Sequence, residues 1–130
     1  MIVAVDIGNS ETSVGIGGYQ SWKSFRFTTR TPMTSDEWLM MLKSTLPKDV
    51  DMSKDAVGSI VCSVVPQINN DFLIALTDYL GTNPILLGPG IKTGLSVNID
   101  NPKELGPDRI ANSVGGIHKV GAPLIVIDMG

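Results

Sequence analysis

The feature that most constrains the fold is the start of the chain, where a short apolar run leads directly into a polar turn. Residues 2–5 (Ile-Val-Ala-Val) are hydrophobic and mostly β-branched, which is typical of a buried strand. The pentapeptide at 6–10 (Asp-Ile-Gly-Asn-Ser) follows, and a second strand is predicted over residues 12–16, so the pentapeptide should form a hairpin tip. Such a turn is either an ordinary hairpin turn or a place where backbone N–H groups and small side chains approach a phosphate.

The composition limits the kinds of partner that the chain can have. Its 130 residues are enough for one domain with a core, and 42% hydrophobic against 18% charged residues is typical of a globular protein. The net charge of −3 and the lack of a Lys/Arg cluster argue against a nucleic-acid partner, so phosphate binding would depend on local geometry. A single histidine excludes a multi-histidine metal site.

Cellular location is also constrained by the sequence. With one cysteine there is no internal disulfide, which favours a reducing compartment and hence a cytoplasmic protein. No apolar run reaches the ~20 residues that a membrane span needs, and the chain start lacks the basic region of a signal peptide. We therefore expect no membrane partner. Cys62 lies in an apolar run and is expected to be a buried core residue rather than a nucleophile.

The hydrophobic periodicity of the remaining chain predicts an alternation of strands and helices. Strands are predicted over 22–28, 56–65, 84–87, 95–99 and 124–127, helices over 34–46, 67–79 and from Pro107, and a polar loop over 48–54. A three-stranded meander followed by strand–helix units predicts an α/β domain whose mixed sheet has helices on its faces. The pair Gly115-Gly116 weakens the last helix and predicts close packing of another backbone there.

A second segment with possible chemistry precedes the last helix. Pro107 is well placed as the first helical residue, and Asp108 then falls in the first turn, where free N–H groups favour a carboxylate. Asp108 and Arg109 are either a helix-start acid with a surface cation, or a base that accepts a hydroxyl proton beside an arginine that binds an anionic substrate.

Four segments, in this order and spacing, resemble the type III pantothenate kinase family. They are Asp6–Ser10, Ser63–Pro66, Asn101-Pro102 with Gly106–Arg109, and Ile127–Gly130. The resemblance covers essentially the whole chain. It implies the superfamily of acetate and sugar kinases, Hsp70 and actin, which is built from two ribonuclease H-like domains. The chain would then be the first such domain, with a mixed five-stranded sheet flanked by helices.

The resemblance implies a nucleotide site and two metal sites. Asp6, Gly8, Asn9 and Ser10 match the first phosphate motif, in which Asp6 would help position Mg²⁺, through water, beside the phosphates of ATP. Ser10 stands where the family often has threonine and keeps the hydroxyl. Asp128 matches the start of the second phosphate motif, near the site of a monovalent cation, K⁺ or NH₄⁺.

The resemblance also implies a substrate site. Asp108 matches the catalytic base that takes the proton from the primary hydroxyl of pantothenate, and Gly106 and Arg109 match the pantothenate side of the site. Pro107 replaces an alanine common in the family, a change that suits a helix start. Ile99 stands where many members place a pantothenate-contacting tyrosine, so substrate binding there would lack a hydroxyl.

The function implied is ATP-dependent phosphorylation of pantothenate to 4′-phosphopantothenate, the first step of coenzyme A biosynthesis, by a homodimer. The family's second phosphate motif continues past the glycine and a second domain follows, and neither is present in residues 1–130. We therefore expect a truncated N-terminal half that is inactive alone. The alternatives are a non-catalytic accessory or transcriptional regulatory protein of the same fold, and a kinase of the superfamily that uses a sugar or acetate.

Overall fold

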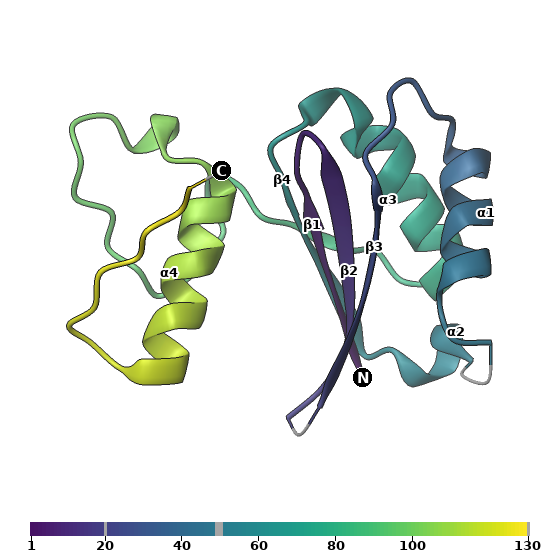
Figure 1. The fold of residues 1–130 in the computed structure, drawn as a ribbon, viewed down its shortest axis with the longest axis horizontal. Helices are drawn as coiled ribbons and strands as arrows, with labels where there is room; N and C mark the ends of the chain where they lie inside the picture. The colour runs from purple at the N-terminus through teal and green to yellow at the C-terminus, as the bar shows by residue number, and fades with distance from the viewer. Residues whose placement is uncertain (20, 49–50, 130) are drawn as a thin grey trace.

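The fold is given by a computed structural model, which describes residues 1–19, 21–48 and 51–129, with only the backbone at residue 103. The elements follow one another in the order β1 (Ile2–Ile7), β2 (Glu11–Gly17), β3 (Trp22–Thr28), α1 (Ser35–Thr45), α2 (Met52–Asp55), β4 (Gly58–Ser63), α3 (Pro66–Leu80), β5 (Ile85–Leu86), the 3₁₀ helix η1 (Pro102–Glu104) and α4 (Pro107–Val120). Figure 1 shows this arrangement.

The five strands form one mixed sheet in the order β3-β2-β1-β4-β5. The first three strands are an antiparallel meander, in which Ile7 lies opposite Thr12. β4 is parallel to β1, with Cys62 opposite Asp6, and β5 is parallel to β4. The α/β class and the mixed five-stranded sheet flanked by helices are therefore confirmed.

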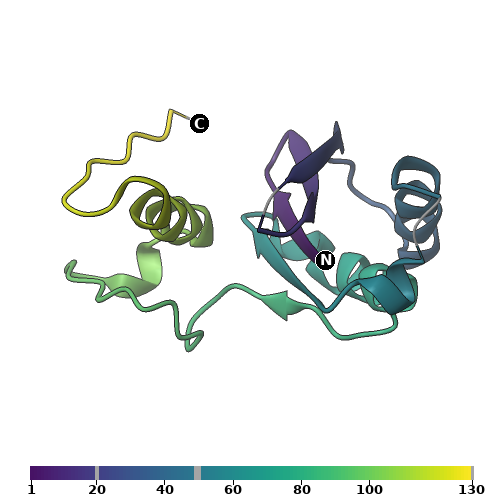
Figure 2. The ribbon, with the colours of Figure 1, turned by 90° about the horizontal axis from the view of Figure 1, so that it is seen from below.

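The core lies between one face of the sheet and the helices α1 and α3, which pack against each other. Figures 1 and 2 show these two helices on one side of the sheet and α4 on the other. Because side chains alternate along a strand, Val3, Val5 and Ile7 of β1 all point into this core and are buried. Their burial makes β1 the centre of the domain.

Helix α1 forms as its sequence predicts. Thr34 and Glu37 make a capping box, in which the Thr34 N–H donates to the Glu37 carboxylate at 2.8 Å and the Glu37 N–H donates to Thr34 Oγ1 at 3.3 Å. The predicted core face of this helix is confirmed by Trp38, which is fully buried and meets Phe72 of α3 edge-on at 5.2 Å between ring centroids. Such aromatic pairs stabilise a core beyond the area they bury.

Helix α3 also matches its prediction closely. Pro66 is its first residue, where the missing N–H carries no penalty, and Gly81 ends it with φ of 70°. In contrast, the predicted polar loop over 48–54 contains the short helix α2, whose Met52 is buried; residues 49–50 lie outside the described residues.

Two predicted strands are wrong. Residues 95–99 lie in a loop, and residues 124–127 are not part of the sheet. Within the described residues no strand pairs with 124–127, so the apolar run is extended but open to water, with Ile125 89% and Ile127 79% exposed. Gly130, the last residue of the fourth motif, lies outside the described residues.

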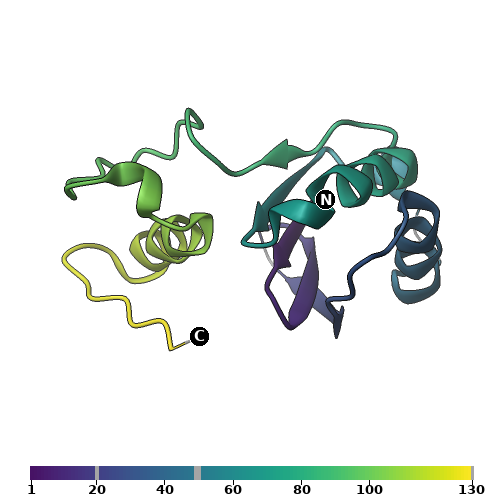
Figure 3. The same cartoon turned by 90° about the horizontal axis from the view of Figure 1, so that it is seen from above.

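Helix α4 begins at Pro107 as predicted, but none of its described side chains is buried. Figure 1 shows the C-terminal segment running back along this helix, and Figure 3 shows the segment beside the helix, which is seen nearly end-on. A Cβ on Gly116 would lie 2.8 Å from Leu124 Cδ1, whereas a Cβ on Gly115 would meet nothing within 4 Å. The predicted close packing at the glycine pair is therefore made by Gly116 alone, against a side chain of the following segment.

The packing of α1 leads to a stability prediction with a control on the same helix. Leu42 is fully buried, whereas Met40 is 71% exposed. Leu42→Ala should lower the free energy of unfolding by about 2–5 kcal/mol, because it removes buried methyl groups and leaves a cavity. Met40→Ala should change it by less than about 0.5 kcal/mol. Urea unfolding followed by circular dichroism measures both, and equal effects would contradict this placement of α1.

Candidate active site

The turn after β1 is held tightly by its own backbone and by a neighbouring threonine. The Gly8 N–H donates to the Glu11 carbonyl at 2.9 Å, and a Cβ on Gly8 would lie 3.0 Å from that same oxygen. The Thr29 hydroxyl donates to the Gly8 carbonyl at 2.7 Å and lies 2.8 Å from the Thr12 hydroxyl. This rigid turn leaves little room for a side chain at position 8.

Thr12 and Thr29 are structural supports of this turn that the sequence reasoning missed. Thr12 is fully buried, although strand residues facing a core are usually apolar. Thr12 alternates with Val14 and Ile16 along the strand, so the sequence could have placed it on the buried face. A polar residue on a buried face needs a hydrogen-bond partner. Thr29, its partner, lies beyond the next strand, and its role could not be inferred without the register of the sheet.

The tip of the turn faces solvent. The side chains of Asn9 and Ser10 are both exposed. The Ser10 carbonyl accepts from the Thr29 N–H at 2.9 Å, which fixes the end of the turn. Because the Gly8 N–H is used inside the turn, a phosphate at this tip would be met by the groups of residues 9 and 10 rather than by the glycine N–H.

Three predicted acidic residues come together beside this turn. Burial raises the pKa of the Asp6 carboxyl above its usual value, although the residue as a whole is exposed. The negative charges of Asp108 in α4 and Asp128 in the C-terminal segment raise the Asp6 pKa further. The carboxylates of Asp108 and Asp128, from distant parts of the chain, therefore both lie within electrostatic reach of Asp6. A nearby cation would relieve their repulsion.

Cys62 is buried as predicted, with 7% exposure, but it belongs to this site as well as to the sheet. It lies opposite Asp6 in the register of β1 and β4, and its thiol favours the charged form of the Asp6 carboxyl, which lowers the Asp6 pKa. Burial raises the pKa of Cys62 to about 12, and the charges of Asp6 and Asp108 add to the effect. The thiol therefore stays protonated at neutral pH, whereas a nucleophilic cysteine reacts as the thiolate.

The start of α4 presents the predicted substrate-side residues. Gly106 is the N-cap, and its carbonyl accepts from the Arg109 N–H at 3.2 Å. Arg109 and Ile99 are exposed, and neither is among the groups that perturb the pKa of Asp6 or Cys62. Asp108 and Asp128 therefore lie near Asp6, whereas Arg109 and Ile99 lie on the surface without an effect on the Asp6 or Cys62 pKa.

The donor set of this site suits a hard cation. Carboxylate oxygens are the ligands that Mg²⁺ prefers, and burial followed by the charges of Asp108 and Asp128 raises the Asp6 pKa. However, the described residues contain no group of three or more His, Cys, Asp or Glu side chains close enough to hold one ion together. The carboxylates fit a cation bound through water or shared with a phosphate better than one enclosed by protein.

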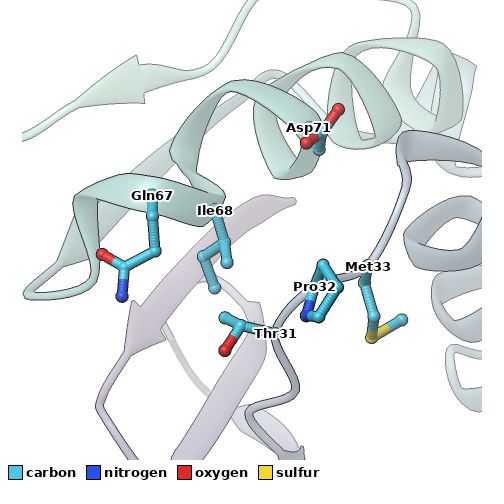
Figure 4. Close-up of a pocket in the computed structure, with 6 residues that line it drawn as sticks. All are labelled: Thr31, Pro32, Met33, Gln67, Ile68 and Asp71. Carbon is cyan, nitrogen blue, oxygen red and sulfur yellow. The ribbon is translucent and has the colours of Figure 1, made fainter.

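A separate cavity of about 270 Å³ opens beside α3, on the face of the sheet that α1 also covers. Figure 4 shows its lining, which consists of Thr31, Pro32, Met33, Gln67, Ile68 and Asp71. None of the predicted site residues lines it. In the described part of the chain, no helix has the length and apolar character needed to cross a membrane.

The crowding of carboxylates should cost stability in a pH-dependent way. A carboxyl whose pKa is raised on folding holds its proton more tightly in the folded chain, so its contribution to stability falls as pH rises through that pKa. Asp6→Asn should therefore stabilise the chain at pH 7, and the gain should vanish as pH is lowered through the raised Asp6 pKa. Thermal unfolding from pH 4 to 8 measures this difference.

The control removes a carboxylate far from the cluster. Asp36 lies in the first turn of α1, where the helix dipole favours negative charge, so Asp36→Asn should not stabilise the chain. A pH-independent effect of Asp6→Asn, or no gain at pH 7, would contradict the proximity of the three acids.

Comparison with known proteins shows the family of this chain. The profile of the family described as "Type III pantothenate kinase" matches residues 2–130. Curated relatives of that name include proteins of Shouchella clausii (43% identical), Geobacillus kaustophilus (41%) and Bifidobacterium animalis subsp. lactis (39%). Each alignment covers 100% of this chain and 51–52% of the relative, so the chain spans about half the length of these relatives. With the family profile matched from Ile2 to the last residue, the chain belongs to the type III pantothenate kinase family.

Proposed function

We propose that this chain is the first half of a kinase that transfers the γ-phosphoryl group of ATP to the primary hydroxyl of pantothenate. The observation that carries the proposal is the convergence of Asp6, Asp108 and Asp128, since each comes from a different family motif. Transfer of a phosphoryl group needs positioned oxygen ligands for a cation and a group that accepts the hydroxyl proton. The three acids supply both kinds of group in one place.

The nucleotide side of the site is the turn after β1. Asn9 and Ser10 meet the ATP phosphates at the solvent-facing tip of the turn, and Gly8 shapes the turn through its backbone hydrogen bond to Glu11. Asp6 would help to hold Mg²⁺ through water, and Asp128 adds negative charge that a monovalent cation, K⁺ or NH₄⁺, would balance. When bound, Mg²⁺ neutralises the charge that develops on the phosphates.

The substrate side is the start of α4. Asp108 accepts the proton from the pantothenate hydroxyl as its oxygen forms the new bond to the γ-phosphorus atom, and the bond from that phosphorus to the bridging oxygen of ADP breaks. Arg109, exposed one residue further on, binds the substrate carboxylate, and Gly106 and Ile99 lie against pantothenate.

The proposal places a second domain after residues 1–130. Two observations support it: the chain spans about half the length of its relatives, and Ile125 and Ile127 are exposed in an extended segment with no strand beside it among the described residues. A nucleotide site between two domains needs both walls. We further propose a cytoplasmic homodimer, on the family resemblance alone.

The test uses a longer protein, in which this chain is joined to the second half of the Shouchella clausii relative. With Mg²⁺ and K⁺ or NH₄⁺ present, it should release ADP only when pantothenate is added. Asp108→Asn should lower kcat by about 10²–10⁴-fold with little change in KM for ATP, because only proton transfer is lost.

The matched control is Asp78→Asn, which changes an exposed carboxylate on α3 and should leave kcat unchanged. ADP release that does not depend on pantothenate, or that survives Asp108→Asn, would overturn the proposal. Phosphorylation of a sugar or acetate instead would point to another kinase of the same superfamily. A folded protein with no kinase activity would favour an accessory role.

A further inference from the structure

Gly106, the N-cap of α4, is a glycine that its own backbone does not require. Its φ of −61° and ψ of 144° are extended values that any residue adopts. Glycine is commonly needed where φ is positive, as at Gly81 with φ of 70°. Backbone conformation therefore does not account for the glycine at position 106.

Helix stability alone would favour another residue at this position. Ser, Thr, Asp and Asn are the preferred N-caps because their side chains accept a hydrogen bond from the first helical N–H groups. Gly106 provides no side-chain cap to α4. The first turn of α4 therefore lacks the side-chain hydrogen bond that often stabilises a helix start.

The space beside Gly106 is filled by a carboxylate. A Cβ built on Gly106 would collide with Oδ1 of Asp108 and would lie 3.4 Å from its Cγ. The intervening residue is Pro107, whose ring restricts φ, so the backbone here has little freedom to relieve such a collision. A side chain at position 106 would have to displace the Asp108 carboxylate.

The position of that carboxylate also matters to the other acidic residues. Asp108 is close enough to act on both Asp6 and Cys62, which lie on adjacent strands. An aspartate has only two side-chain torsions, so a carboxylate moved from this position has few alternatives that keep it near Asp6.

We propose that Gly106 is a positioning residue: the lack of a side chain at this N-cap leaves the space in which the Asp108 carboxylate folds back beside Asp6. This role differs from contact between Gly106 and substrate. Its consequence for turnover rests on the function proposed above, whereas the placement of the carboxylate does not.

The first experiment tests the placement directly in the 130-residue chain. The ¹³Cγ resonances of Asp108 and Asp6 are compared at fixed pH in the unsubstituted chain, in Gly106→Ala and in Gly115→Ala. Gly115 lies on the same helix with open space around it, so its substitution is the matched control. Both resonances should shift in Gly106→Ala and stay in place in Gly115→Ala. Unshifted resonances in Gly106→Ala would overturn the proposal.

The second experiment separates positioning from structural support. Gly106→Ser restores a preferred N-cap, so the thermal stability of the chain should be kept or raised. In the longer protein the same substitution should lower kcat by about 10²-fold, the cost of a misplacement near 1 Å, with KM for pantothenate changed less than threefold. A rise in KM for pantothenate with kcat unchanged would leave Gly106 with its substrate contact alone and would overturn the positioning role. If the unsubstituted longer protein does not phosphorylate pantothenate, the proposed function fails, while the resonances still decide the role of Gly106.

Discussion

The rest of this structure depends on the alternation of side chains along β1, in which successive residues point to opposite faces of the sheet. Val3, Val5 and Ile7 point into the core, and the same alternation sends Asp6 to the opposite face of the sheet. Because β1 pairs with β2 on one side and with β4 on the other, both its faces and its register are fixed. The acid is therefore held by the strongest part of the fold, directly opposite Cys62.

The surroundings of Asp6 show that this position is not optimised for stability. A partly desolvated carboxylate near two further acids costs free energy, and only the Cys62 thiol among the groups that perturb it favours its charged form. The domain tolerates this cost because its core is formed elsewhere, between the other face of the sheet and the helices α1 and α3. Perturbed acids of this kind cluster at functional sites, in agreement with the family to which the chain belongs.

The sequence predicted those parts of the fold that depend on near neighbours. The capping box of Thr34 and Glu37 and the stop at Gly81 are local, and both helices have nearly the predicted bounds. The run at 124–127 has the composition of a buried strand, but a strand also needs a partner, which composition does not supply. The carboxylate cluster was accessible only through the resemblance, because Asp6, Asp108 and Asp128 are far apart in the sequence. Thr29 was missed for the same reason.

The two halves of the candidate site differ in how firmly they are held. Asp6 and the following turn belong to the sheet, whereas Asp108 belongs to α4, which has no buried side chain, and Asp128 to an exposed segment. Segments with few buried contacts open at low free energy, so α4 and residues 121–129 should be less stable than the sheet. Gly116 allows Leu124 to pack on α4, and Gly106 leaves space for the Asp108 carboxylate at its start. These local contacts set the geometry of the helix, and a partner for its exposed apolar residues would hold that geometry more rigidly.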